Sequence, residues 1–278
     1  MLTRLFHFFI FTSLFIALCA VLMVHQTYQL FHLPENYYYL LFVFFSTICS
    51  YNFHWYLTPH SVKPSSRLQW AQKHKGYHLA FYFLGLVGCI VLFFPLAKHW
   101  PWILFAGFIT FLYSAPKLPQ HIFKWLKKIA IGKTIFLAVV WTYVTTVLPV
   151  AIADGTWSIN IILFVLGRFF FIYAICILFD YRDREDDRAE GIKSMITYFN
   201  EAGINFLFAV SLVLFGALTI AMLKYGHSIL TVCIILLPGI IVAALYNRAK
   251  KNFSDIFYYF ILDGLMMLSA LLMLLLSI

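Results

Sequence analysis

The segment that decides the fold is INIILFVLGRFFFIYAICILF at residues 159–179, which runs directly into DYRDREDDRAE at residues 180–190. The first stretch has 21 residues and one charged side chain, Arg168. An α-helix needs about 20 mostly apolar residues to cross the hydrocarbon core of a bilayer. The pattern therefore predicts a membrane-spanning helix that ends in a strongly acidic segment at the water interface.

The rest of the chain has the same apolar character. Of its 278 residues, 63% are hydrophobic and 11% are charged, and the mean hydropathy is +0.88. A soluble domain has about 25% charged residues, and disordered chains combine low hydrophobicity with high charge, so both classes are excluded. We expect an all-α integral membrane protein in which residues 1–278 form a single polytopic domain.

Nine segments are long and apolar enough to be membrane-spanning helices. We interpret the first as a retained helix rather than a cleaved signal peptide, because its apolar stretch is long and lacks a small-residue cleavage site. The predicted spans are 5–24, 37–57, 77–96, 101–115, 134–153, 159–179, 203–223, 227–247 and 257–277.

Basic residues lie almost entirely on one side of these spans. Of the 20 Lys and Arg residues, Lys98 and Lys224 fall on the other side and Arg168 falls within a span. The positive-inside rule then places the N-terminus in the cytoplasm and the C-terminus outside. This topology accounts for the net charge of +9 without a nucleic-acid partner, and attraction to anionic membrane lipid or to a phosphate-bearing ligand is the alternative. We expect a multi-pass protein of a bacterial cytoplasmic membrane.

The acidic segment carries six of the eleven Asp and Glu residues of the chain. If the helix continues, Asp180, Asp183 and Asp187 share one face, because they are spaced i, i+3 and i+7. Like charges in such a stripe repel one another unless a cation lies between them. Mg²⁺ suits the stripe, since it takes one or two carboxylates and completes its shell with water and phosphate oxygens. The alternative is a solvated helix end in which the interleaved arginines pair with the acids.

The stretch DYRDREDDRAEGIKS at residues 180–194 resembles the second aspartate-rich motif of the UbiA-type membrane prenyltransferases. The resemblance implies a helical bundle around a cavity that opens near the cytoplasmic face, capped by loops at about 58–76 and 180–202. It implies that Asp183 and Asp187 are catalytic and bind Mg²⁺ together with a prenyl diphosphate, with Asp180 as a supporting metal ligand.

A second match is Tyr113-Ser-Ala-Pro-Lys117, which resembles the Tyr-x-x-x-Lys element of the same family. The resemblance implies that Tyr113 and Lys117 contact the diphosphate. Lys193, within the GIKS end of the acidic motif, is expected to add positive charge at the same site. A lysine at a membrane boundary is also an ordinary interfacial residue, and that alternative remains open for Lys117.

The first motif of the family, NDxxDxxxD, is degenerate in this chain. Asn52 is kept, but Phe53, Tyr56 and His60 stand at the three Asp positions. Phe cannot bind a metal and Tyr is a poor ligand for Mg²⁺ at neutral pH. Basic residues such as Arg67 are therefore expected to bind substrate in place of a metal, and Asn52 is expected to bind substrate as well.

Two functions follow from this resemblance. The first is Mg²⁺-dependent transfer of an isoprenoid chain from a prenyl diphosphate to a lipophilic acceptor, aromatic or lipid-like. The second is a non-catalytic carrier of isoprenoid phosphates on the same fold, which the degenerate first motif favours. Inside the bilayer, Arg168 needs a partner, and Asp263 of the last span is the expected counter-ion; the alternative is that Arg168 lines a substrate cavity.

The nine-span topology makes a direct prediction about the two ends of the chain. A reporter that is active only in the cytoplasm should be active when fused to the N-terminus and inactive at the C-terminus. Activity at the C-terminus would contradict the topology.

Overall fold

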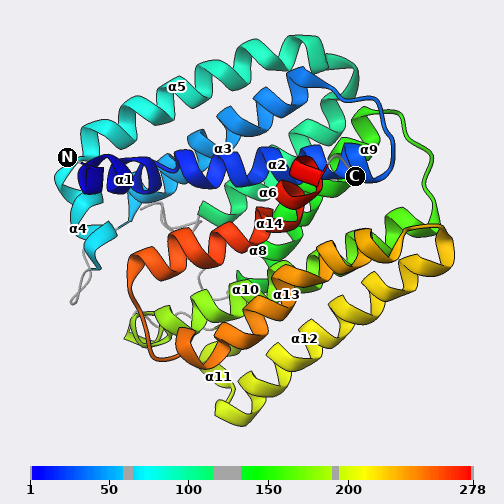
Figure 1. The fold of residues 1–278 in the computed structure, drawn as a ribbon. Coiled ribbons are helices and arrows are strands. Elements are labelled where there is room, and N and C mark those ends of the chain that lie inside the picture. Colours follow the sequence, from blue (N-terminus) through cyan, green and yellow to red (C-terminus); the bar gives the residue numbers. More distant parts are fainter. Residues whose placement is uncertain (1, 59–64, 115–132, 190–193, 277–278) are drawn as a thin grey trace.

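The computed structural model describes residues 2–58, 65–114, 133–189 and 194–276, and every regular element in these ranges is a helix (Figure 1). Two short elements, η4 and η6, are π-helical, and η1 and η5 are 3₁₀ helices. The elements are α1 (Leu2–Phe11), α2 (Leu14–Leu30), α3 (Tyr37–Leu57), α4 (Ser66–Lys73), α5 (Lys75–Phe93), η1 (Phe94–His99), α6 (Trp100–Ser114), α8 (Lys133–Thr142), η4 (Tyr143–Val147), α9 (Leu148–Ile152), α10 (Ile159–Ala189), α11 (Met195–Tyr198), α12 (Glu201–Ala221), η5 (Met222–Tyr225), α13 (Ile229–Ala249), η6 (Phe257–Leu262) and α14 (Asp263–Leu276).

Six helical stretches among the described residues are long and apolar enough to cross a membrane, or seven if the bent pair α1–α2 counts as one span. The prediction of nine spans is therefore not confirmed. One of the six stretches, Lys75–Leu112, joins two predicted spans through η1. Another predicted span, α3, has 21 residues, but its tyrosines and its polar residues lower its hydropathy.

The first predicted span is not one continuous helix. The chain bends by 60° between α1 and α2, at Ser13, whose φ of 67° lies in the left-handed region. The Thr12 carbonyl, beside the break, accepts a hydrogen bond of 3.0 Å from the Asn52 side chain of α3. A side chain from a neighbouring helix thus satisfies a backbone group at the break, which periodicity alone could not predict.

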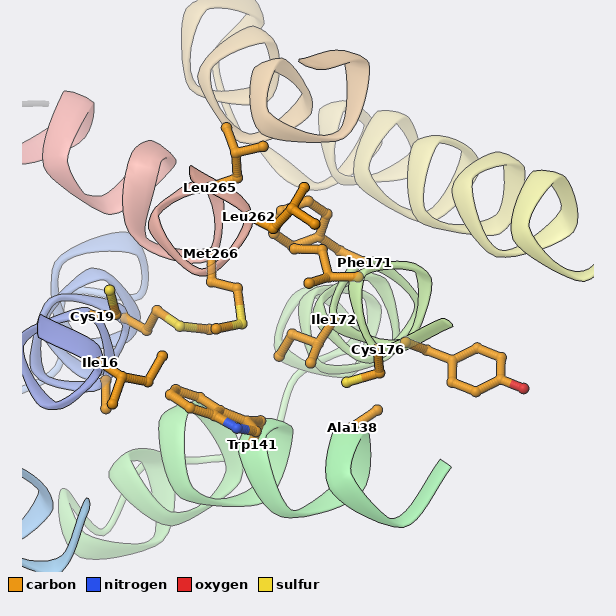
Figure 2. Close-up of a cluster of buried hydrophobic side chains, with 14 of the residues drawn as sticks. Ile16, Cys19, Ala138, Trp141, Phe171, Ile172, Cys176, Leu262, Leu265 and Met266 are labelled. Carbon is orange, nitrogen blue, oxygen red and sulfur yellow. The ribbon is translucent and has the colours of Figure 1, made fainter. Parts of the chain in front are cut away.

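The helix that carries the acidic segment continues beyond the membrane stretch, which is the condition for Asp180, Asp183 and Asp187 to share one face. Helix α10 runs for 31 residues without a break, and its membrane-embedded part is the most buried of the six stretches. A helix that is apolar on all sides belongs inside a bundle. Figure 2 shows α10 side chains packed between α2, α8 and the last helix. The labelled residues are Ile16, Cys19, Ala138, Trp141, Phe171, Ile172, Cys176, Leu262, Leu265 and Met266.

Arg168 is held in the bundle by neutral groups, so the predicted pair with Asp263 is wrong. Its Nη1 donates to the carbonyls of Met23 (3.0 Å) and Thr145 (2.9 Å) and lies 3.0 Å from two threonine hydroxyls. Its Nη2 donates to Gln26 Oε1 at 2.6 Å. Thr145 belongs to the π-helix η4, whose wider turn makes carbonyls available to outside donors. The arginine thereby ties α10 to α2 and η4.

Helices α3 and α5 approach each other closely at glycines. A Cβ atom on Gly85 would lie 2.7 Å from the backbone nitrogen of Cys49 and from the carbonyl oxygen of Phe45. Small residues at helix interfaces permit this close backbone contact in membrane bundles.

Replacing Gly85 with Ala should therefore destabilise the bundle, because backbone atoms of α3 cannot rotate away from the added methyl group. We expect a loss of about 1–3 kcal/mol, as for other overpacked interiors, seen as a lower Tm in detergent. Gly216→Ala is the matched control, because a Cβ there meets nothing within 4 Å. Equal Tm values for the two variants would contradict the close approach of α3 and α5.

Candidate functional site

The three aspartates of the acidic stripe lie on the end of α10, where the helix leaves the membrane stretch. Asp180 and Asp187 are buried, each with 6% of its surface exposed, whereas 40% of the Asp183 side chain is exposed. Asp180 accepts a hydrogen bond from the Thr134 hydroxyl of α8. The unbroken helix keeps all three on one face, with Asp183 the most open to solvent.

Carboxylate oxygens suit a hard divalent cation, and Mg²⁺ takes one or two of them. In the part of the chain that the structure describes, no group of three or more His, Cys, Asp or Glu side chains is placed to hold a metal ion. The predicted set of Asp180, Asp183 and Asp187 thus forms no ready-made three-ligand site. Two carboxylates one helical turn apart, Asp183 and Asp187, still fit an ion that draws its other ligands from water and phosphate.

Arg182 connects the stripe to the end of the chain. Its Nε donates to Asp183 Oδ1 at 2.8 Å, and its Nη2 donates to the Tyr259 hydroxyl of η6 at 2.6 Å. Its Nη1 lies 4.0 Å from Asp255 Oδ1. Asp255 is 7% exposed. A buried carboxylate therefore faces the exposed end of α10 from the start of the last span.

Arg67, a predicted substrate-binding residue, lies in the same cluster. Its backbone N–H donates to Asp255 Oδ2 at 2.7 Å, and its Nη2 lies 3.3 Å from the Ser13 hydroxyl at the α1–α2 break. Its guanidinium carbon is 4.0 Å from the centre of the Tyr259 ring and 4.3 Å from that of Trp55. Burial lowers the pKa of Arg67, and the neighbouring Tyr259 and acidic residues oppose that shift. The side chain is 2% exposed, with aromatic faces supplying much of its contact.

Asn52 is completely buried. Its Nδ2 donates to the carbonyls of Thr12 (3.0 Å) and Ile48 (2.8 Å), and its Oδ1 lies 2.7 Å from Nδ1 of His78 on α5. Both ends of the amide are thus used to join α3 to the helix break and to α5.

Of the positions that replace the first motif, Phe53 serves packing and Tyr56 is exposed. The Phe53 ring stacks on Tyr82 of α5 with centroids 5.3 Å apart, and Tyr56 is 39% exposed. His60 lies outside the described residues, as do the predicted phosphate contacts Lys117 and Lys193. Tyr113 lies in the last turn of α6.

The described parts of the predicted cap loops contain short helices. Helix α4 occupies part of 58–76, and α11 follows α10 within 180–202. Ser194 begins α11 with a reciprocal capping box to Thr197.

A small cavity of about 20 Å³ lies elsewhere, beside Arg168, Gln26 and Ser269. None of the three aspartates lines it, so a cavity opening near the acidic stripe is not confirmed.

Sequence reasoning missed Arg182 and Tyr259 as parts of this cluster. The sequence signal that could have identified these residues was the position of two charged side chains. Asp255 is an acid in a basic loop before the last span, and Arg182 is adjacent to Asp183. Their proximity depends on how α10, α4 and η6 meet, which no local pattern encodes.

Comparison with known proteins gives one match. The sequence model of the UbiA prenyltransferase family matches residues 73–272, a range that includes the acidic stripe and begins after Asn52 and Arg67. Searches of curated proteins and of solved structures found no match. Since the matched range covers well over half of the chain, the protein belongs to the UbiA prenyltransferase family, which implies membrane prenyltransferase activity in general.

Proposed function

We propose that the protein is a Mg²⁺-dependent prenyltransferase that moves an isoprenoid chain from a prenyl diphosphate to an aromatic or lipid-like acceptor. The observation that carries this proposal is the pair Asp183 and Asp187 on one face of α10, just where that helix leaves the membrane stretch. There a phosphate head group can reach the carboxylates while its lipid tail stays in hydrocarbon. The site faces the cytoplasm in the proposed topology, with the N-terminus inside and the C-terminus outside.

Asp183 and Asp187 would hold the metal ion, with Asp180 in a supporting position behind them. Asp183 is the most open of the three, so it is the best placed to share an ion with a substrate phosphate. Mg²⁺, when bound, would offset the negative charge that develops on the departing diphosphate.

Basic residues would contact the remaining phosphate oxygens. Arg67 is close to the stripe through Asp255 and Arg182, and Lys117, Lys193 and Tyr113 are assigned by resemblance to the family. For Asn52 we propose a positioning role, because its amide is already bonded to backbone carbonyls and to His78. Through the α1–α2 break it would set the position of Ser13, which Arg67 contacts.

The reaction breaks the allylic C–O bond, and diphosphate leaves with the bonding electron pair. The nucleophilic atom of the acceptor forms the new bond to the prenyl carbon and releases a proton to solvent. Aromatic faces, such as those of Trp55 and Tyr259 beside the cluster, would stabilise positive charge on the allylic group and exclude water.

A carrier of isoprenoid phosphates on the same fold is the second candidate. Its support is that Phe53 and Tyr56 stand where the family has carboxylates, and Phe53 is engaged in packing against Tyr82. A carrier would bind the same head group and release it unchanged.

Under the enzymatic proposal, Asp183→Ala should abolish turnover, because the metal loses its most open ligand. Asn52→Ala should weaken substrate binding only modestly. The measurement is release of diphosphate from labelled prenyl diphosphates by purified protein, with and without Mg²⁺. Glu185→Ala is the matched control, since this exposed acid lies on the opposite face of the same turns. Equal and negligible effects of Asp183→Ala and Glu185→Ala on turnover would remove the catalytic reading.

The enzyme and the carrier would bind the same head group, so a binding measurement tests that shared property separately from catalysis. A non-hydrolysable prenyl diphosphate analogue should bind only with Mg²⁺ present, and the double variant Asp183→Asn/Asp187→Asn should lose that binding by isothermal titration. Tight, metal-independent binding to the double variant would show that the stripe is a solvated helix end. Metal-dependent binding without turnover would favour the carrier.

A further inference from the structure

Two buried arginines converge on one ring beside the acidic stripe. Arg67 comes from α4 and Arg182 from α10, and their guanidinium carbons lie 4.0 and 4.8 Å from the centre of the Tyr259 ring. The Arg182 side chain is 11% exposed. Asp255 lies between them, bonded to the Arg67 backbone N–H and 4.0 Å from Arg182 Nη1.

This cluster contains three buried polar atoms that have no hydrogen-bond partner among the described residues. They are Arg67 Nε, Arg182 Nη1 and Asp255 Oδ1. Leaving a charged donor or acceptor unsatisfied in the interior is costly, and such atoms usually mark a site for water, an ion or a ligand. Arg182 Nη1 and Asp255 Oδ1 face each other at 4.0 Å, so a single water molecule could serve both atoms, whereas Arg67 Nε is a cationic donor that an anionic oxygen would satisfy.

The charge balance changes when Asp183 binds a cation. Arg182 now donates to Asp183 at 2.8 Å. Once the carboxylate turns to a metal ion, Arg182 loses this hydrogen-bond partner, and the acids left facing the two guanidinium groups are Asp255 and the buried Asp263, which interacts electrostatically with both. The planar fork of arginine matches the oxygens of a phosphate better than a point charge does.

We propose that Arg182 and Arg67, held in place by Asp255 and Tyr259, form a phosphate-binding subsite beside Asp183, and that this arginine subsite stands in for a second metal ion. The inference rests on the proposed head-group chemistry of the acidic stripe. It adds Arg182 as a substrate-binding residue and Asp255 as the positioning residue for both arginines. The head group is then neutralised by one divalent cation and two guanidinium groups.

The test uses Mn²⁺ alone and then Mn²⁺ with inorganic pyrophosphate on the full-length protein in detergent. Arg182→Gln should weaken pyrophosphate binding at least about tenfold, since it removes hydrogen bonds to a charged group. The same variant should bind Mn²⁺ alone at least as tightly as the wild type does, because Asp183 loses its competing partner. Arg182→Lys keeps the positive charge but lacks the planar guanidinium group. Its affinity for pyrophosphate should lie between those of the wild type and Arg182→Gln.

Arg184→Gln is the matched control, since Arg184 donates to Glu201 on α12 at 2.8 Å and should leave pyrophosphate binding unchanged. Should Arg182→Gln fail to fold, Arg182→Lys and Arg67→Gln carry the same test. Electron paramagnetic resonance should count one Mn²⁺ per protein with pyrophosphate bound.

Two bound Mn²⁺ ions, or an Arg182→Gln variant that binds pyrophosphate like the wild type, would overturn the subsite. A parallel loss of Mn²⁺ and pyrophosphate affinity would also overturn it, because that pattern indicates a purely structural arginine. Turnover is a separate readout. If the wild type transfers prenyl groups but Arg182→Gln keeps its pyrophosphate affinity, the subsite is wrong and the proposed enzymatic function stands. If the expected binding pattern is found without turnover, the subsite stands and the protein is a carrier.

Discussion

Charge that lies in or beside a bilayer has to be matched locally, because the surrounding hydrocarbon offers neither water nor counter-ions. This constraint acts at two places on helix α10. The helix carries Arg168 among buried apolar side chains and an acidic end beyond them. The groups that neutralise or bond to charge differ between these two places. Arg168 is held by carbonyls, hydroxyls and an amide, whereas Arg182 is held by a carboxylate and a phenol.

Two irregular parts of the helices lie at polar contacts between helices. A regular α-helix uses most of its carbonyls in its own hydrogen bonds, although the Met23 carbonyl of the regular helix α2 also accepts a hydrogen bond from Arg168. The π-helix at Tyr143–Val147 makes the Thr145 carbonyl available to Arg168. The break at Ser13 likewise leaves the Thr12 carbonyl to be satisfied by Asn52. Both irregularities thus lie where a polar side chain from another helix bonds to the backbone.

The cluster at the acidic end of α10 is assembled from elements far apart in the chain. Arg67, Arg182 and Asp255 come from α4, α10 and the start of the last span, and Tyr259 contacts both arginines. Loss of the first-motif carboxylates is thus accompanied by a buried cationic cluster next to the remaining ones. Under the proposed function, that arrangement would place positive charge where a departing diphosphate has to be stabilised.

The sequence by itself determined the helical membrane class, the acidic segment that directly follows residues 159–179, and the family to which that motif points. These depend on local properties, namely the length of apolar runs and the 3.6-residue period. Only the tertiary structure decided that the first span is broken at Ser13, that Arg168 is satisfied by neutral groups rather than by Asp263, and that Asp255 faces Arg182. Each of these depends on which side chain from a distant segment reaches a given backbone or charged group, and that is set by helix packing rather than by neighbours in the chain.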